Sequence, residues 1–197
     1  MKSELQIKKT GLYFGSFNPI HNGHLILAEH ILQNSDLSQI WFVVSPQNPL
    51  KNRASLLDNR NRLAMVRLAI DDNEGFLASD IEFSLPQPSY TINTLVYLSE
   101  KYPLREFSLI LGEDNLENFN KWRNYTTILE YYKLYIYPRR AAKPSPLAEN
   151  RNVIMIDAPQ IDISSSFIRE NIKSGKSIRY LVPEKVRLEI EKGGYYR

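Results

Sequence analysis

The stretch Gly15–Leu25 reads GSFNPIHNGHL and decides the fold class of this chain of 197 residues. It directly follows the short apolar run Gly11–Phe14 and leads into the apolar run Leu25–Ala28. This order is typical of a strand, a tight loop and a helix. The first N–H groups of such a helix have no intrahelical partner and point beyond the strand end, which favours an anion, most often phosphate. The sequence therefore predicts a phosphate-binding loop at this junction.

Strand-like and helical patterns alternate along the rest of the chain. Further strands are predicted at 40–44, 76–78, 81–85, 107–111, 132–137 and 153–156. Helices are predicted around 59–70 and around 91–100, the latter capped by Ser89 or Thr91, and two more begin at Ser164–Ser166 and at Pro183. Such alternation implies right-handed crossovers and a mostly parallel sheet. We therefore expect a Rossmann-like, doubly wound α/β fold with helices on both faces and a small C-terminal helical part, formed by one domain over residues 1–197.

In a sheet of this kind, ligands bind at the carboxyl ends of the strands. The segments that follow predicted strands are 15–24, 45–53, 112–114 and 138–140. We expect them to meet in one cleft.

The composition fits a globular protein with small anionic ligands. Hydrophobic residues make up 43% and charged residues 24%, and no apolar run is long enough to span a bilayer. The net charge of +3 is too small and too evenly spread to indicate nucleic acid. There is no cysteine, and the first residues lack the pattern of a signal peptide. We expect a cytoplasmic protein with neither membrane nor nucleic-acid partners, and the oligomeric state stays open.

His21 and His24 are three residues apart at the start of the predicted helix, which places their rings on one face. Two imidazoles there can donate hydrogen bonds to phosphate oxygens, and their protonated form would oppose the negative charge of a phosphoryl or nucleotidyl transition state. Zinc would need a third ligand, and the remaining histidine, His30, is on a later turn. We therefore predict phosphate chemistry and no protein-held metal.

The loop is neither a Walker A motif nor a G-x-G-x-x-G motif. It resembles the G-x-F-x-P-x-H-x-G-H signature of the nucleotidyltransferase superfamily, whose members attack the α-phosphate of a nucleoside triphosphate and release pyrophosphate. The stretch Ile163–Arg169, ISSSFIR, resembles the second signature of that superfamily, I-S-S-T-x-I-R. Two such motifs in this order are far more specific than either alone.

Within the superfamily, the whole chain is similar to the nicotinate-nucleotide adenylyltransferases. Pro88–Thr91 resembles the P-S-Y-T stretch that holds the nicotinate end, and Leu111–Asp114 with Trp122 resembles the residues lining the nucleotide and pyridine pockets. Tyr137–Arg140 resembles the arginine-bearing strand end that faces the mononucleotide phosphate.

The chain departs from the family pattern at several positions. Serine replaces the common threonine at Ser16 and Ser166, asparagine replaces the usual aspartate at Asn18, and Arg123 stands where an aromatic residue sometimes occurs. A proline-histidine-basic run is replaced by Asn48–Arg53, where Lys51 or Arg53 is expected to reach the triphosphate.

The resemblance implies transfer of AMP from ATP, bound with Mg²⁺, to nicotinate mononucleotide, which gives nicotinate adenine dinucleotide and pyrophosphate in NAD biosynthesis. The alternatives are transfer to nicotinamide mononucleotide and a non-catalytic nucleotide sensor of the same fold. His21 and His24 are the expected catalytic residues. The expected ATP-binding residues are these two histidines with Gly15, Ser16, Phe17, Asn18, Gly112, Asp114, Ser165, Ser166, Ile168 and Arg169. The expected mononucleotide-binding residues are Tyr90, Thr91, Trp122 and Arg139.

Overall fold

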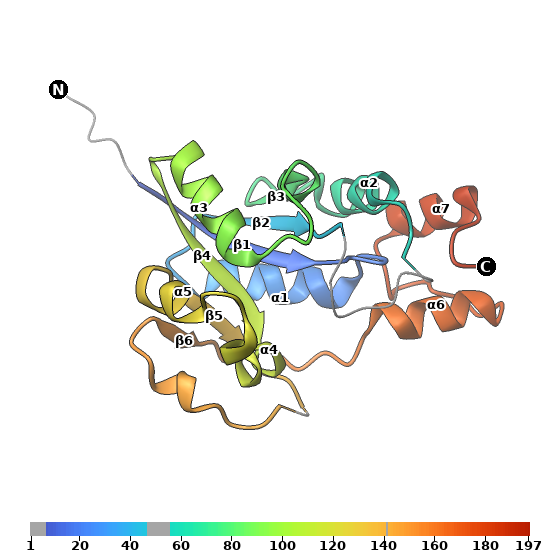
Figure 1. Ribbon diagram of the computed structural model, residues 1–197. Coiled ribbons are helices and arrows are strands. Elements are labelled where there is room, and N and C mark those ends of the chain that lie inside the picture. The colour runs from blue at the N-terminus through green and yellow to red at the C-terminus, as the bar shows by residue number, and fades with distance from the viewer. Residues whose placement is uncertain (1–6, 47–55, 141) are drawn as a thin grey trace.

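Six parallel strands form the centre of the computed structural model, which describes residues 7–46, 56–140 and 142–197 (Figure 1). The strands are β1 (Lys8–Gly15), β2 (Gln39–Val44), β3 (Phe76–Ser79), β4 (Arg105–Gly112), β5 (Leu134–Tyr137) and β6 (Val153–Met155). They are arranged in the order β3-β2-β1-β4-β5-β6, and every pairing is parallel. The predicted doubly wound fold is confirmed. The strand order reverses between β1 and β4, which is where ligands bind in open sheets of this type.

The helices cover both faces of the sheet. They are α1 (Asn22–Gln33), α2 (Asn59–Ile70), α3 (Thr91–Lys101), α4 (Glu113–Glu117), α5 (Tyr125–Tyr131), α6 (Ser165–Lys173) and α7 (Glu184–Gly193). The described residues also form the short 3₁₀ helices η2 (Ile81–Phe83), η3 (Phe119–Lys121) and η4 (Pro146–Glu149). Among the described residues, every helix is too short or too polar to cross a membrane.

Alternate residues of the strands belong to two hydrophobic clusters, one on each face of the sheet, because successive side chains of a β-strand point to opposite faces. On one face, Tyr13 of β1 and Phe42 of β2 pack with apolar residues of α1, α2, α6 and α7. On the other face, Leu12 and Trp41 pack with apolar residues of α3, α4 and α5. Burial on both faces explains why these strands read as continuous apolar runs in the sequence. The predicted C-terminal helical part therefore belongs to the first cluster, and α7 packs beside α2 (Figure 1).

Two local predictions are wrong. The expected edge strand at 81–85 is the 3₁₀ helix η2, because the N–H groups of Phe83 and Ser84 bond to carbonyls three residues back. The edge of β2 is occupied instead by β3. The second error concerns the start of α3, where Tyr90 is the N-cap and its side chain makes no capping bond, so neither Ser89 nor Thr91 is the cap.

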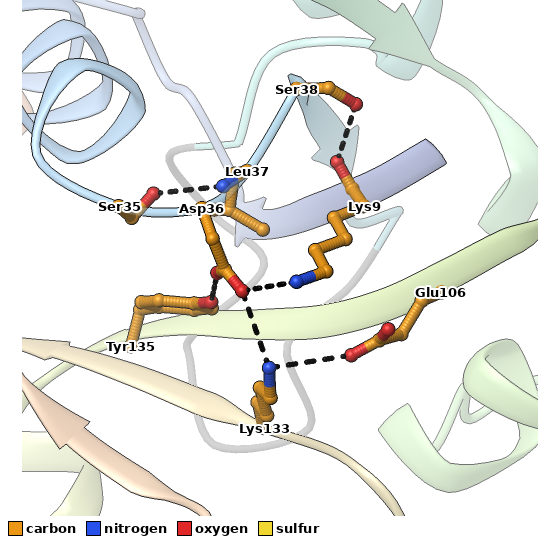
Figure 2. A network of polar contacts seen from close by, with 8 residues as sticks. All are labelled: Lys9, Ser35, Asp36, Leu37, Ser38, Glu106, Lys133 and Tyr135. Carbon is orange, nitrogen blue, oxygen red and sulfur yellow. Dashed lines mark hydrogen bonds and ion pairs between the residues drawn. The ribbon is translucent and has the colours of Figure 1, made fainter. Parts of the chain in front are cut away.

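A polar network ties together the amino ends of the strands, at the end of the sheet opposite Gly15 and Gly112 (Figure 2). Asp36 follows α1 and accepts hydrogen bonds from Lys9 Nζ at 2.6 Å and from the Tyr135 hydroxyl. Lys133 Nζ lies 3.4 Å from Asp36 and 3.6 Å from Glu106. The bonds from Lys9 and Tyr135 hold the pKa of Asp36 well below its usual range.

We predict that Asp36→Asn lowers the melting temperature at pH 7 by about 2–4 °C, a modest shift because the side chain is partly exposed. The pKa of Asp36 is lower in the folded than in the unfolded protein. Its stabilising contribution is therefore present above pH 4 and lost as the pH falls. Calorimetry from pH 3 to 7 should show a constant gap between wild type and variant down to about pH 4, and a smaller gap at pH 3.

The control is Asp162→Asn, which removes one partner of an exposed pair with Arg140. It should leave the melting temperature almost unchanged. A wild-type to Asp36→Asn gap of equal size at pH 3 and pH 7 would contradict the prediction.

Candidate active site

The loop between β1 and α1 turns sharply at the carboxyl end of the central strand. Phe17 has a positive φ of 42°, and the Asn18–Pro19 peptide bond is cis. A Cβ atom on Gly15 would lie 2.7 Å from the Phe17 ring, so only glycine allows this close approach. The turn makes His21 the N-cap residue of α1.

The two histidine rings are stacked, with centroids 3.6 Å apart and an interplanar angle of 28°. This confirms that their spacing places them on one face. The backbone N–H of His21 donates to Nδ1 of His24 at 3.2 Å. Because Nδ1 accepts this bond, the proton of a singly protonated His24 ring belongs on Nε2.

The charge of His21 differs from the protonated form considered in the sequence analysis. Its side chain is 5% exposed, and within the described part of the chain its Nδ1 has no hydrogen-bond partner. Burial, and secondarily the positive charge of Arg139, lowers the pKa of His21 to about 4. His21 is therefore neutral at pH 7 in the free protein, and its buried Nδ1 is a hydrogen-bonding atom that the described residues leave unused.

The second motif docks directly on the first. Ser164 caps α6 by accepting from the Phe167 N–H at 3.1 Å. Ser165 Oγ donates to the Pro19 carbonyl at 2.9 Å, and Arg169 donates to the Asn18 carbonyl at 2.8 Å.

Two other residues of this motif do not bond to the loop. Ser166 Oγ accepts from Arg169 at 3.2 Å, and the side chain of Ile168 is fully buried in the core. Ile168 therefore offers a ligand only its backbone.

Asn18 fixes the middle of the loop. It is 4% exposed, and its Oδ1 accepts from the Leu57 N–H at 3.2 Å and from the Tyr196 hydroxyl at 2.9 Å. Both neighbours donate to an oxygen, so an amide serves these two contacts as an aspartate would. The sequence patterns gave no indication of Leu57 or Tyr196 as partners, because they are 39 and 178 residues from Asn18.

Sequence reasoning also missed Arg62, a fully buried residue of α2. All five N–H groups of its guanidinium are used. Nε donates to the Leu57 carbonyl, Nη1 to the carbonyls of Ser16 and Ser45, and Nη2 to the Pro46 carbonyl and to Asn59 Oδ1. The available signal was an arginine on the apolar face of the predicted helix.

The ends of β4 and β5 form a second group of predicted residues. Gly112 is the N-cap of α4, and Asp114 lies in its first turn. Arg139 Nε is 3.9 Å from Asp114 Oδ1, and Arg139 Nη2 donates to the Tyr137 hydroxyl at 3.3 Å. A Cβ atom on Gly112 would lie 2.4 Å from Asp114 Oδ1, so another residue there would displace the Asp114 carboxylate.

This group is connected to the histidines through aromatic side chains. The hydroxyls of Tyr137 and Tyr13 are 3.4 Å apart, and the Tyr13 ring lies 6.0 Å from the ring of His24. Arg139, which the sequence assigns to the mononucleotide, thus lies among residues assigned to ATP.

Tyr90 and Trp122 belong to a third group on the other face of the sheet. Both are half-buried against the core cluster of α3 and α5. Trp122 packs on Phe119 with centroids 4.9 Å apart, and the guanidinium of Arg123 lies 4.8 Å from the centroid of the Tyr90 ring. The two loops are therefore in contact.

A buried carboxylate lies beneath the loop before α3. Glu82 is 3% exposed, and its Oε1 accepts from Thr94 Oγ1 at 3.0 Å. Burial raises the pKa of Glu82, while hydrogen bonds from the side chains of Ser45, Thr94 and Ser89 oppose that shift. The end of β2 and the approach to α3 are thus joined through one side chain. Lys51 and Arg53 lie outside the described residues.

A histidine-bearing loop at the switch point of a doubly wound sheet, bonded to a serine-rich helix start, is typical of a nucleotidyltransferase-like class. A family model described as cytidylyltransferase-like matches residues 12–171. A protein of Flavobacterium johnsoniae named "probable nicotinate-nucleotide adenylyltransferase" is 53% identical over 191 residues, which cover 96% of this chain and 99% of that protein. A protein of Cytophaga hutchinsonii with the same name is 52% identical over 188 residues, or 95% and 98% of the two chains. The chain therefore belongs to the cytidylyltransferase-like family and, within it, to the nicotinate-nucleotide adenylyltransferases.

Solved structures support the fold. The nicotinic acid mononucleotide adenylyltransferase of Plasmodium falciparum, complexed with NaAD, is 22% identical and superposes with a TM-score of 0.80 over 96% of this chain and 97% of that one. The same enzyme complexed with APC gives a TM-score of 0.79 with the same identity and coverage.

We predict that Arg62→Lys lowers the free energy of unfolding by about 2–4 kcal/mol, because a lysine has three donors on one nitrogen and leaves buried carbonyls unsatisfied. Urea unfolding measures the loss. The matched control is Arg60→Lys at an exposed position of the same helix, which should change stability by less than about 0.5 kcal/mol. Equal effects of the two substitutions would contradict this account of Arg62.

Proposed function

We propose that this protein transfers the AMP group of ATP to nicotinate mononucleotide, forming nicotinate adenine dinucleotide and pyrophosphate. The observation that carries the proposal is the direct bonding of the two motifs, Ser165 to Pro19 and Arg169 to Asn18. Hydroxyls, an arginine, two histidines and a helix start thereby converge at the reversal of strand order. Such an arrangement suits a triphosphate.

The reaction needs no covalent enzyme intermediate. A 5′-phosphate oxygen of the mononucleotide attacks the α-phosphorus of ATP in line, a new P–O bond forms, and the bond to the pyrophosphate oxygen breaks. Catalysis then consists of holding the two substrates in line and stabilising the charge that develops on the phosphate oxygens.

The roles of the residues follow from their positions in the fold. The proton on His24 Nε2 would be donated to an α-phosphate oxygen, and neutral His21 would add a second hydrogen bond without the standing charge that burial disfavours. A phosphate dianion beside His21 would raise its pKa from about 4. Gly15, Ser16 and Phe17 would line the triphosphate together with Ser165, Ser166 and Arg169, and Ile168 would contribute its backbone.

The remaining predicted residues divide between the two substrates. Gly112 and Asp114 would bind the nucleoside of ATP. Tyr90, Thr91 and Trp122 would hold the pyridine end of the mononucleotide, with the ring stacked on the indole. Arg139, beside Asp114, would face phosphate oxygens at the place where the two substrates meet.

The proposed function also implies that ATP binds with Mg²⁺, that the chain acts as one domain and that the protein works in the cytoplasm. The substrate is taken to be the Mg²⁺ complex of ATP, with the ion carried by phosphate oxygens. Residues 1–197 would act as one domain, since residues 18–19 and 165–169 form a single site. The cytoplasm supplies both proposed substrates.

We predict that His24→Ala reduces turnover by roughly two to four orders of magnitude, because it removes a hydrogen bond that strengthens as charge develops. Pyrophosphate release with ATP and nicotinate mononucleotide measures it. The control is His30→Gln on the same helix, since the His30 ring bonds to the Asp157 carbonyl at 2.7 Å, and this variant should stay near wild-type activity. Turnover of His24→Ala near the wild-type rate would contradict the assigned role.

The same assay tests the acceptor. Wild-type protein should release pyrophosphate with nicotinate mononucleotide faster than with nicotinamide mononucleotide or phosphopantetheine. ATP binding without product from any acceptor would instead indicate a nucleotide sensor.

A further inference from the structure

Arg123 is an exposed cation held against the loop that carries Tyr90. Its guanidinium lies 4.8 Å from the centroid of the Tyr90 ring, although the two residues come from separate loops. Within residues 7–46, 56–140 and 142–197, its side chain shows no ion pair and no hydrogen bond, and the stack on Tyr90 is its one polar contact. The contact places beside Tyr90 a charge that no described carboxylate pairs with.

The cation–π contact does not use the hydrogen-bonding capacity of the guanidinium. A guanidinium has five N–H donors in its plane. Two parallel N–H groups of such a plane match the two oxygens of a carboxylate. Arg123 therefore places unused donors and a positive charge beside the Tyr90 ring.

Two other charged residues of this region, Lys121 and Glu82, make hydrogen bonds of their own. Lys121 Nζ bonds to Asn118 Oδ1 at 2.7 Å. The carboxylate of Glu82, on the approach to Tyr90, is buried and accepts a hydrogen bond from Thr94. Neither side chain contacts the guanidinium of Arg123.

Arg123 also directly follows Trp122, the residue on which the pyridine ring is proposed to stack. The N–H groups at the start of α3, beside Tyr90, are neutral and can donate either to a carboxamide oxygen or to a carboxylate oxygen. A fixed cation discriminates between the two, because only the carboxylate carries a charge.

We propose that Arg123 is the specificity-determining residue that makes this protein select nicotinate mononucleotide over nicotinamide mononucleotide, by pairing with the pyridine carboxylate. The inference rests on the proposed function and adds to it the residue that distinguishes between the two acceptor mononucleotides. Arg123 acts in acceptor selection and has no part in the binding of ATP.

The experiment compares wild type with Arg123→Gln, which keeps hydrogen-bonding capacity and removes the charge. The dissociation constants of the two mononucleotides are measured by titration calorimetry, and kcat/KM by pyrophosphate release. We expect the affinity for nicotinate mononucleotide to fall about 10- to 100-fold, the range for a lost charged hydrogen bond. The affinity for nicotinamide mononucleotide should change by less than about threefold, and KM for ATP should stay unchanged. The selectivity ratio, which is the affinity for nicotinate mononucleotide divided by that for nicotinamide mononucleotide, should therefore fall.

Two further variants sharpen the test. Arg123→Lys keeps the charge but loses the planar fork, so it should recover part of the selectivity. Lys121→Gln removes a neighbouring charge from the same segment and should leave the ratio at its wild-type value. A ratio in Arg123→Gln equal to that of wild type, or equal losses for both mononucleotides, would overturn the inference.

The binding and turnover measurements separate this inference from the proposed function. Wild-type protein that binds nicotinate mononucleotide selectively through Arg123 but forms no product would overturn the proposed reaction and support the assignment of Arg123.

Discussion

The geometry of the site depends on the hydrogen bonds that the Arg62 guanidinium donates to backbone carbonyls. Carbonyl groups just beyond the carboxyl ends of β1 and β2 no longer pair with a neighbouring strand, and burying a carbonyl without a donor costs free energy. Arg62 supplies donors to Ser16, Ser45 and Pro46 from one rigid plane. Its charge is compensated by these dipoles and by the Asn59 and Leu57 oxygens. The loop between β1 and α1 is thereby held to β2 and to α2.

The loop fixed in this way is then closed from the other side by residues much later in the chain. The start of α6 bonds to the carbonyls of Asn18 and Pro19, and Tyr196 bonds to the Asn18 side chain. Polar contacts are thus concentrated at the carboxyl end of the sheet, while a second network around Asp36 fastens the amino end. Between these two polar ends, the clusters on both faces of the sheet are apolar.

The charges around the site differ in kind as well as in place. Burial keeps His21 neutral at pH 7, whereas Arg169 and Arg139 remain cationic beside the strand ends. Arg123 stands apart from them at the Tyr90 loop. This separation matches the proposed substrates, whose phosphates and pyridine carboxylate are distant negative groups. Under the proposed assignments, separate cations would bind the phosphates and the pyridine carboxylate.

The sequence by itself determined the alternation of strands and helices, the tight loop after the first strand and the pairing of the two histidines, because each depends on neighbours within a few residues. Only the tertiary structure decided that Arg62 binds strand-end carbonyls, that Tyr196 reaches Asn18 and that Arg139 lies beside Asp114. It also showed η2 where an edge strand was expected. These contacts join residues from separate elements, and no local pattern records which side chains the crossovers will bring within bonding distance. The sequence therefore specified the elements and the chemistry of the loop, and packing decided which side chains complete the site.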